Sequence, residues 1–520
     1  MERLPEKAGN KMELNLFFEG VDSIGGYQSR LLQAIDDEVH FNKCICTVKA
    51  ADDLDVYDED KYIPINYDIC ERNRYEEYYD MNSLLPLDKE ILEKMLPYES
   101  TAMKMLVRNM ERDIYTYDES KRLYLNHLRF WNHMFVSHQI NYVVQVCVPH
   151  HCHDYIIYAL AKIYGCGLMV LEMTSIRHHY ISAPDMYKIN EELQAKYEEC
   201  RKGTDFSLSE PVEKYYQALL LENRNVDKSF LHGNTKKEKH VKNMQNIYYQ
   251  YFTKKSIWKR NKSKIKKLVL NGILKFNGAE IKKQKAIIRQ DLDYVKRARI
   301  KQRQMRDINY FNSLTEEADY SKPYVIYFLH YQPEATTLPL AGVFVEQELV
   351  IALLAEELEK QGIELWVKDH YVQACRTKNF YDTLKNTKNV RLIHTSMNSL
   401  ELMEKSLATA TCNGSIIQES IFNLKPVFAF GNGPFVGAPG TFVCGSREDV
   451  RKAVEQLKED YKIDKQDVRA YLKAFDELKV YTNIYVSYSN LPCDLSEEES
   501  IRNMKEAVVP RINKHLSTLE

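Results

Sequence analysis

Apolar residues occur along this chain in two alternating patterns, short β-branched or aromatic runs and longer stretches at helical spacing. An apolar run at 14–18 leads through a glycine-containing turn into helical spacing over 27–35. Further along the same unit, strands are predicted at 142–148 and 168–171 on either side of a helix at 154–164. Strands that alternate with helices predict a parallel sheet, whose ligands gather at the carboxyl ends of its strands.

A second unit of the same kind begins after Lys322-Pro323. Its strands are predicted at 324–329, 363–367, 390–393, 409–412 and 427–430, and its helices at 344–361, 416–423 and 447–458. The final helices, 465–477 and 495–515, are expected to pack back on the first unit. We therefore predict an α/β fold of two Rossmann-like domains, with helical and basic insertions in the N-terminal one. The expected boundaries are 1–315, 316–490 and a terminal helix within 491–520.

Length and composition agree with two domains in an intracellular protein. The chain has 520 residues, of which 44% are hydrophobic, enough for two cores. Residues 1–40 lack the pattern of a signal peptide, and no run approaches the roughly 18 apolar residues that span a bilayer. The 11 cysteines form no paired CxxC sets, so we expect reduced thiols and a cytoplasmic location.

The formal net charge of −2 conceals a basic block at about 236–306. Lys255, Trp258, Lys259 and Arg260 combine cations with an aromatic ring, and apolar residues follow them. Such a segment can be a solvated helical face, a nucleic-acid surface or a peripheral membrane contact. The interleaved apolar residues favour contact with an anionic membrane or a lipid-linked acceptor. No nucleic-acid motif accompanies the charge, so a nucleic-acid partner is not expected.

Polar residues follow three predicted strands of the second unit. They are Gln332, Glu334, Lys368, His370, Asn413, Gly414 and Ser415. Lysine and histidine at strand ends suit a phosphate, and Gly414 would let the backbone approach a ligand at the start of the next helix. The glycines at 431–437 fall short of a GxGxxG fingerprint, which argues against nicotinamide binding.

The same segments carry a family resemblance. The run at 327–337, with Lys368-Asp369-His370, Asn413-Gly414-Ser415 and the later Glu419 and Lys425-Pro426-Val427, resembles the bacterial capsule polysaccharide biosynthesis proteins, a group related to Kdo transferases. The resemblance covers mainly residues 322–450. It implies a GT-B fold with the donor nucleotide on the second domain, the acceptor on the first, and no obligatory metal or other cofactor.

The resemblance also implies roles for two residues. His370 would meet the donor phosphate, although Tyr371 stands where the family usually has proline. Glu419 would hold the ribose or the base.

The catalytic residue of the first domain is inferred from the chemistry of the reaction. Glycosyl transfer needs a carboxylate or histidine that accepts a proton from the acceptor hydroxyl, or a carboxylate that acts as nucleophile. The candidates are Asp22, His150, His151, Asp154 and Glu172. His150 and His151 could instead cap the following helix.

Two patterns in the sequence suggest a metal site. Cys147, His150, His151, Cys152 and His153 suggest zinc, but neighbouring positions on one turn point in different directions. Asp53-Leu54-Asp55 and Asp291-Leu292-Asp293 are DxD patterns, but neither ends a convincing strand, so solvated charge is favoured.

The resulting hypothesis is a glycosyltransferase that moves a sugar from a nucleotide-sugar donor, such as a CMP-linked ulosonic acid, to a capsule or lipopolysaccharide acceptor. We expect it in the cytoplasm, at the inner face of the plasma membrane. Two alternatives stay open: a non-catalytic GT-B-fold partner in polysaccharide assembly or export, and a UDP-sugar epimerase of GT-B shape.

Overall fold

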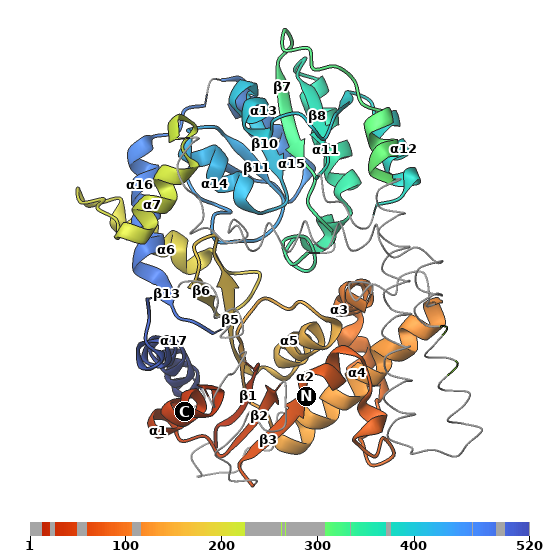
Figure 1. The fold of residues 1–520 in the computed structure, drawn as a ribbon, viewed down its shortest axis with the longest axis vertical. Coiled ribbons are helices and arrows are strands. Elements are labelled where there is room, and N and C mark those ends of the chain that lie inside the picture. Colours follow the sequence, from red (N-terminus) through yellow and green to blue (C-terminus); the bar gives the residue numbers. More distant parts are fainter. Residues whose placement is uncertain are drawn as a thin grey trace.

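The protein folds into two α/β domains, one above the other in Figure 1. The structure is a computed structural model. It describes residues 13–20, 27–48, 60–106, 116–223, 307–332, 334–370, 376–459, 461–484 and 494–518, together with Lys262 and Lys266.

The first domain is built on a seven-stranded sheet in the order β13-β6-β5-β4-β1-β2-β3. The strands are β1 (Asn15–Phe18), β2 (Lys43–Val48), β3 (Tyr62–Asn66), β4 (Tyr142–Gln145), β5 (Gly167–Met173), β6 (His179–Ala183) and β13 (Lys479–Tyr481). Strands β1 to β5 are parallel, whereas β6 and β13 are antiparallel additions. The strand order reverses between β1 and β4, and such a switch point opens a crevice at the carboxyl ends.

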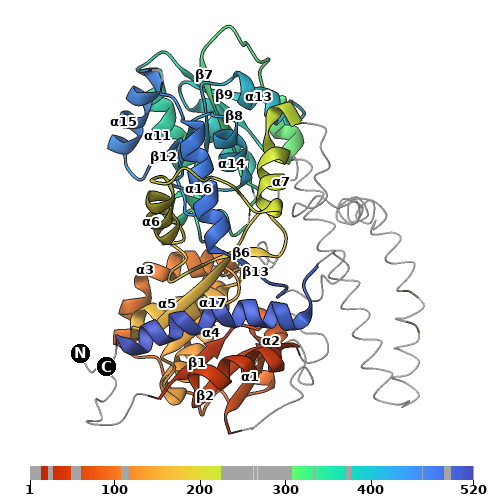
Figure 2. The ribbon, with the colours of Figure 1, turned by 90° about the vertical axis from the view of Figure 1, so that its left-hand side faces the viewer.

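Helices cover both faces of this sheet. They are α1 (Tyr27–Val39), α2 (Tyr67–Glu71), η2 (Tyr75–Glu77), α3 (Lys89–Leu106), α4 (Tyr117–His138), α5 (Cys152–Tyr164) and α17 (Glu497–Ser517). Figure 2 shows α17 lying across the lower domain beside α1, where its Met504, Val508 and Ile512 are fully buried. The hydroxyl of Tyr27 bonds to that of Ser500 at 2.9 Å, so the end of the chain completes the first domain.

The second domain has a six-stranded, wholly parallel sheet in the order β12-β11-β10-β7-β8-β9. Its strands are β7 (Tyr324–Phe328), β8 (Glu364–Lys368), β9 (Val390–Ile393), β10 (Ala408–Thr411), β11 (Val427–Ala429) and β12 (Thr441–Val443). Its helices are η5 (Gly342–Val345), α11 (Gln347–Glu359), α12 (Lys378–Asn386), α13 (Ser399–Lys405), α14 (Ser415–Phe422) and α15 (Arg447–Lys458). The switch point of this sheet lies between β7 and β10.

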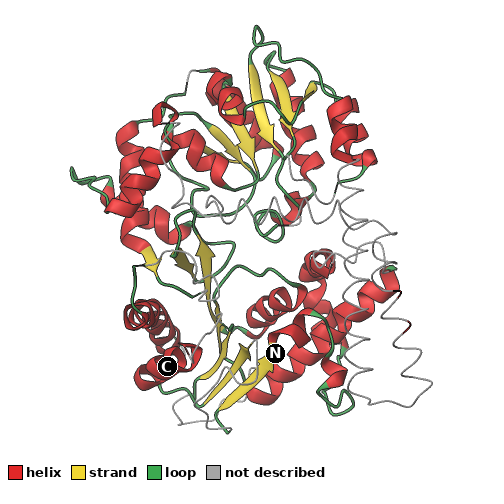
Figure 3. Cartoon of the chain, viewed as in Figure 1, coloured by secondary structure: helices red, strands yellow, loops and turns green. Residues whose placement is uncertain are grey.

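Hydrophobic alternation explains why both faces of the second sheet are covered. Val325 and Tyr327 of β7 belong to a core with α11 and α15, while Tyr324 and Ile326 join a smaller core with Leu402 of α13. Figure 3 shows the two sheets in yellow with their flanking helices in red. The predicted fold class, α/β with two Rossmann-like domains, is confirmed.

The chain passes from one domain to the other at positions that differ from the expected domain boundaries. Helices α6 (Glu191–Cys200) and α7 (Glu210–Leu219), with η4 (Leu221–Asn223), pack on α16 (Lys465–Leu478) and α14 of the second domain. The Asn423 amide donates to the Leu219 carbonyl at 2.9 Å, although the sequence assigned 1–315 to the first domain. In the other direction, β13 joins the first sheet before the expected boundary at 490.

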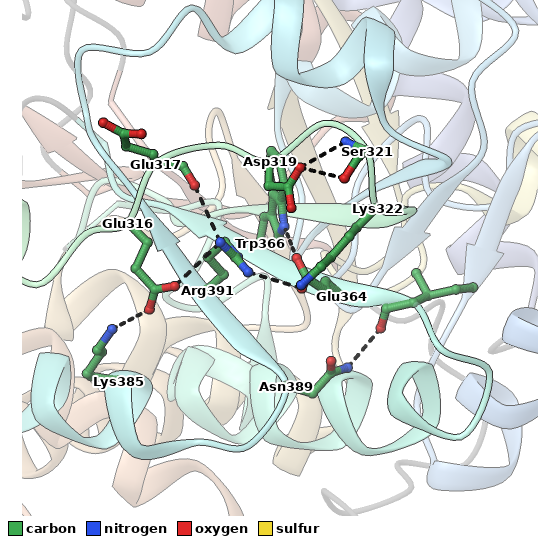
Figure 4. Close-up of polar contacts among 11 residues, drawn as sticks. Glu316, Glu317, Asp319, Ser321, Lys322, Glu364, Trp366, Lys385, Asn389 and Arg391 are labelled. Carbon is green, nitrogen blue, oxygen red and sulfur yellow. Dashed lines mark hydrogen bonds and ion pairs between the residues drawn. The ribbon is translucent and has the colours of Figure 1, made fainter.

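The amino ends of the second sheet are tied by a charged network (Figure 4). Arg391 of β9 pairs with Glu316 and with Glu364 of β8, at 3.5 and 3.1 Å. Lys322 also pairs with Glu364, whose other carboxyl oxygen accepts the Trp366 indole N–H at 2.9 Å. Because this network lies at the amino ends of the strands, it is on the opposite edge from the switch-point crevice.

Within the described residues, no helix has both the length and the apolar composition needed to cross a bilayer.

Candidate functional site

The loops after β7 and β10 meet at the switch point of the second sheet through His330. This residue follows β7, and its Nε2 lies 3.2 Å from the main-chain nitrogen of Asn413 and 2.7 Å from the Thr411 hydroxyl. Both partners belong to the end of β10 or the loop that follows it. The imidazole therefore fixes one strand end against its neighbour.

His330 is a neutral imidazole with an assignable tautomer. Burial, and then the nearby Arg376 and His370, lower the pKa of His330 to about 3. A main-chain N–H can only donate, so Nε2 accepts from Asn413 and the ring proton belongs on Nδ1. The Cε1–Nδ1 edge faces Gly414, where an added Cβ would lie 3.2 Å from Cε1 and 3.7 Å from Nδ1.

Gly414 caps α14 beside this imidazole. Its φ of 95° is in the region that favours glycine, and a Cβ would also crowd His330. The first main-chain N–H groups of a helix have no partners within the helix and attract anions. Ser415, the first residue of α14, is exposed at this end. The Nδ1 proton of His330 and the start of α14 thus face the same small region.

The loop after β11 closes the other side of the site. The Asn413 amide donates to the Asn432 carbonyl, and the Asn432 N–H donates to Leu340 at 2.9 Å. A Cβ at Gly433 would lie 2.5 Å from Oδ1 of Asn413. Because Asn413 is 94% buried and held by Asn432, the glycine is required for this close packing.

The end of β8 holds a second group of charged residues. Lys368 donates from Nζ to the Ser399 hydroxyl at 3.0 Å, and burial lowers its pKa. Asp369 is buried against Arg376, with 2.6 Å between Nη1 and Oδ1, and against the Tyr381 hydroxyl at 2.6 Å. The His370 ring lies 6.0 Å from that of Tyr331 in the loop after β7.

The other predicted donor-binding residues lie around this centre. The Gln332 amide donates to the Val345 carbonyl at 2.8 Å, which fixes the loop after β7. The carbonyl of Glu334 accepts the N–H groups of Thr337 and Leu338. Glu419 is in α14, where its carbonyl accepts from Asn423 at 2.7 Å. Their roles toward a ligand stay predictions.

A carboxyl group of the first domain faces the second domain. Glu172 lies near the carboxyl end of β5, and burial followed by repulsion from Glu334 raises its pKa to about 8. A carboxyl with a pKa near neutral is suited to proton transfer. Glu172 of the first domain and Glu334 of the second therefore lie close enough for their charges to interact.

Among the other catalytic candidates, the two histidines have local contacts. Nδ1 of His150 lies 2.5 Å from the Val148 carbonyl. The His151 main-chain N–H donates to Asp154 at 3.0 Å at the start of α5, and its ring stacks on His153 with centroids 5.8 Å apart. His151 is thus the N-cap residue of α5, where the Asp154 carboxylate accepts its main-chain N–H. Asp22 lies outside the described residues.

The sequence did not single out Glu19, which directly follows β1 at the switch point of the first sheet. It is 96% buried, its Oε1 accepts from the Cys147 thiol at 3.5 Å, and Oε2 has no partner. Burial and then Asp154 raise the pKa of Glu19 well above its ordinary value. Burial opposes ionisation of Asp154 too, but His153 at 2.8 Å holds the pKa of Asp154 low. An acid immediately after an apolar strand was the available signal.

His330, Arg376 and Tyr381 were also not assigned roles. His330 was recognisable only as the first polar residue after a strand, and Arg376 comes 46 positions later, so no spacing rule connects them. The predicted membrane or acceptor contacts lie outside the described residues, as do both DxD patterns; these contacts are Lys255, Trp258, Lys259 and Arg260. In the described part of the chain, no group of three or more His, Cys, Asp or Glu residues has the geometry to hold a metal ion.

Comparisons place the chain among distant structural neighbours. No family model and no curated protein matches its sequence. UDP-GlcNAc 2-epimerase from Neisseria meningitidis, bound to UDP-GlcNAc, is similar at 11% identity and a TM-score of 0.21, over 97% of this chain and 100% of that one. KpsC, a β-Kdo 2,4 transferase of Thermosulfurimonas dismutans, is similar at 12% identity and a TM-score of 0.28, over 70% and 87%. CalG4, the calicheamicin glycosyltransferase, has 11% identity and a TM-score of 0.23, over 97% and 99%.

Proposed function

We propose that the protein is a glycosyltransferase that uses a nucleotide-sugar donor bound at the switch point of the second sheet. The observation that carries this proposal is the convergence of the His330 Nδ1 proton with the amino end of α14 beside Gly414. Hydrogen-bond donors that face one point at a helix start are the chemistry that binds a phosphate group. The resemblance in residues 322–450 supports the same class of donor.

The proposed reaction uses groups from both domains. The acceptor hydroxyl transfers its proton to the ionised carboxylate of Glu172 while its oxygen bonds to the anomeric carbon of the donor sugar. The bond from that carbon to the phosphate oxygen breaks, and the nucleotide leaves with the electron pair. His330 and the N–H groups at the start of α14 stabilise the negative charge on the leaving phosphate. No metal or other cofactor is part of this proposal.

The donor and acceptor are proposals of the same kind. A CMP-linked ulosonic acid is the proposed donor, with Lys368 and His370 assisting at the phosphate and Glu419 at the ribose or base. A capsule or lipopolysaccharide glycan is the proposed acceptor. The basic block at 236–306 would bring the enzyme to the inner face of the plasma membrane, where a lipid-linked acceptor is presented.

Thermal stabilisation by CMP, UDP, GDP and ADP tests the donor site, because a ligand that binds only the native state raises its melting temperature. We expect one nucleotide to stabilise the wild type and His133→Gln equally and to lose its effect in His330→Gln. His133 is a matched control because its ring bonds within α4 of the first domain, to Ser137 at 3.2 Å. Absence of a shift with every nucleotide would overturn the proposal in favour of the non-catalytic partner.

A UDP-sugar epimerase is the second candidate, and the electrostatic interaction between the carboxyl groups of Glu172 and Glu334 favours it. In a pair of carboxyl groups, one can remove a proton from one face of a sugar while the other supplies a proton to the opposite face. Incubation of a UDP-sugar without acceptor in deuterated water separates the candidates. An epimer that carries deuterium identifies the epimerase, whereas sugar transferred to an added glycan identifies the transferase.

A further inference from the structure

Arg376 is a buried cation directly behind the proposed donor site. It immediately precedes Thr377, the N-cap residue of α12, and is 96% buried. One guanidinium nitrogen donates to Oδ1 of Asp369 at 2.6 Å, and another donates to the main-chain carbonyl of His330. Its third nitrogen, Nε, is buried without a hydrogen-bond partner.

Asp369 holds this guanidinium in one orientation. Its side chain is fully buried, and it also accepts the Tyr381 hydroxyl at 2.6 Å and the His370 N–H at 2.7 Å. The network therefore joins the end of β7, the end of β8 and helix α12. Because β7 and β8 are neighbouring strands of one sheet, the network ties helix α12 to their carboxyl ends.

The main chain of His330 is held from both sides. Its N–H donates to Oε1 of Gln347 at 3.2 Å, at the start of α11, and its carbonyl accepts from Arg376. With both main-chain groups fixed, the imidazole ring can move only by rotation about the side-chain torsions of His330. Its Nε2 contact with Asn413 removes that freedom as well.

A buried ion pair adds little net stability, because removing both charges from water costs about as much as their attraction returns. The planar guanidinium of Arg376 instead fixes the relative positions of its partners, because it contacts a carboxylate and a carbonyl at the same time. A lysine ammonium cannot reproduce this arrangement. Its charge also disfavours a second proton on the neighbouring imidazole.

We propose that Arg376, held by Asp369 and Tyr381, is a positioning residue that fixes His330 with its Nδ1 proton facing Gly414 and the anionic part of a nucleotide. The inference rests on the proposed donor site and adds the residue that orders it. Arg376 itself stays behind the His330 main chain and acts through it.

The experiment compares Arg376→Met with Arg391→Met. Arg391 is the matched control because it also pairs with carboxylates of the second domain, but at the opposite ends of the strands (Figure 4). Dissociation constants for CMP and UDP are measured by calorimetry at a temperature where circular dichroism shows every variant folded. We expect Arg376→Met to bind the nucleotide about tenfold more weakly, because His330 is no longer held where it donates to the anionic group, and Arg391→Met to bind like the wild type.

Two further measurements separate positioning from general destabilisation. Added guanidinium ion should restore part of the affinity of Arg376→Ala, and Tyr381→Phe, which removes one hydroxyl, should weaken binding less than Arg376→Met. Equal affinities for Arg376→Met and wild type, or equal losses in Arg376→Met and Arg391→Met, would overturn the inference.

A nucleotide-free readout keeps the inference separate from the proposed function. In protein with nitrogen-15-labelled histidine, the His330 ring signals are identified by their absence in His330→Gln. We expect them to show the Nδ1-protonated form in the wild type and in Arg391→Met, and a different or averaged form in Arg376→Met. Unchanged His330 signals in Arg376→Met would refute positioning even if no nucleotide binds, whereas failure of the wild type to bind would refute only the donor site.

Discussion

At the scale of single residues, the charge state of Glu172 links the fold to the proposed chemistry. Its pKa of about 8 lies above the ordinary value of a glutamate because the carboxyl is partly removed from water and is repelled by Glu334. Between about pH 4.5 and 8 the folded state therefore holds a proton that the unfolded chain has released. The stability contributed by this protonated group is complete below the unfolded pKa and is lost as the pH rises toward 8.

Glu172→Gln should remove this pH dependence. The variant should gain about 2 kcal/mol of unfolding free energy over the wild type at pH 8 relative to pH 5, a value reduced from the full shift because the side chain is only partly buried. Urea unfolding at both pH values measures the gain, with Glu506→Gln, at an exposed position of α17, as the control. If both variants respond alike, Glu172 does not carry the dependence.

The same substitution should slow turnover. A positioned carboxyl that exchanges a proton with the reacting group contributes about 10²- to 10⁴-fold to the rate, and glutamine cannot perform that exchange. We expect kcat for sugar transfer or epimerisation to fall within that range while the nucleotide dissociation constant stays unchanged. A loss of nucleotide affinity with normal kcat would assign Glu172 to binding instead.

At the scale of elements, the turn after β11 is fixed by a close approach that only glycine allows. A Cβ at Gly433 would lie 2.5 Å from Oδ1 of the buried Asn413. Gly433→Ala should therefore displace the loop that begins α14, cost about 1–3 kcal/mol of stability as overpacking does, and weaken nucleotide binding. Gly445→Ala is the control, since its Cβ would meet Asp449 only at 3.7 Å. Calorimetric titration of both variants shows whether the turn acts on the site.

The elements that the sequence predicted share strong apolar periodicity. Val390–Ile393 and Arg447–Lys458 agree with the prediction at both ends, because clear polar boundaries flank them. Strands β2 and β3 were missed. Strand β3 contains Pro64, which breaks a ladder and suits only an edge strand, and β3 does lie at the edge of its sheet. Strand β13 has three residues and exists through its pairing with β6, which local sequence does not encode.

The site was predictable only in part, for a related reason. Strand-end loops could be located from the pattern, and they gave Asn413, Gly414 and Lys368. The contacts that order the site join His330 to Asn413 and Arg376, which lie 83 and 46 positions away. These long-range contacts depend on the order of the strands in the sheet. The hydrophobic periodicity of the sequence does not predict that order.

At the scale of the whole molecule, the two domains direct their carboxyl strand ends toward one another, and the chain crosses between them more than once. Helices α6 and α7 leave the first sheet and pack on the second domain, while β13 and α17 return to the first. The Ser209 hydroxyl donates to Asp476 at 2.6 Å, and the Asn190 amide donates to the Val436 carbonyl. These hydrogen bonds hold the segment with α6 and α7 against residues of the C-terminal half of the chain. Each domain thus depends on segments from the other half of the sequence.

This dependence predicts that a substitution near the end of the chain destabilises the first domain and leaves the donor site of the second intact. Ile512 of α17 is fully buried in the core beneath α1, and Ile512→Ala should lower the unfolding free energy by about 2–5 kcal/mol through lost contacts and a cavity. Its neighbour Asn513 is exposed, so Asn513→Ala should change stability little. Hydrogen exchange should show faster exchange in β1 and α1 of Ile512→Ala, with β7 and β10 unchanged and the nucleotide dissociation constant equal to that of the wild type. Faster exchange at β7 and β10 as well would mean that the two domains unfold as one unit, since α17 contributes side chains only to the first core.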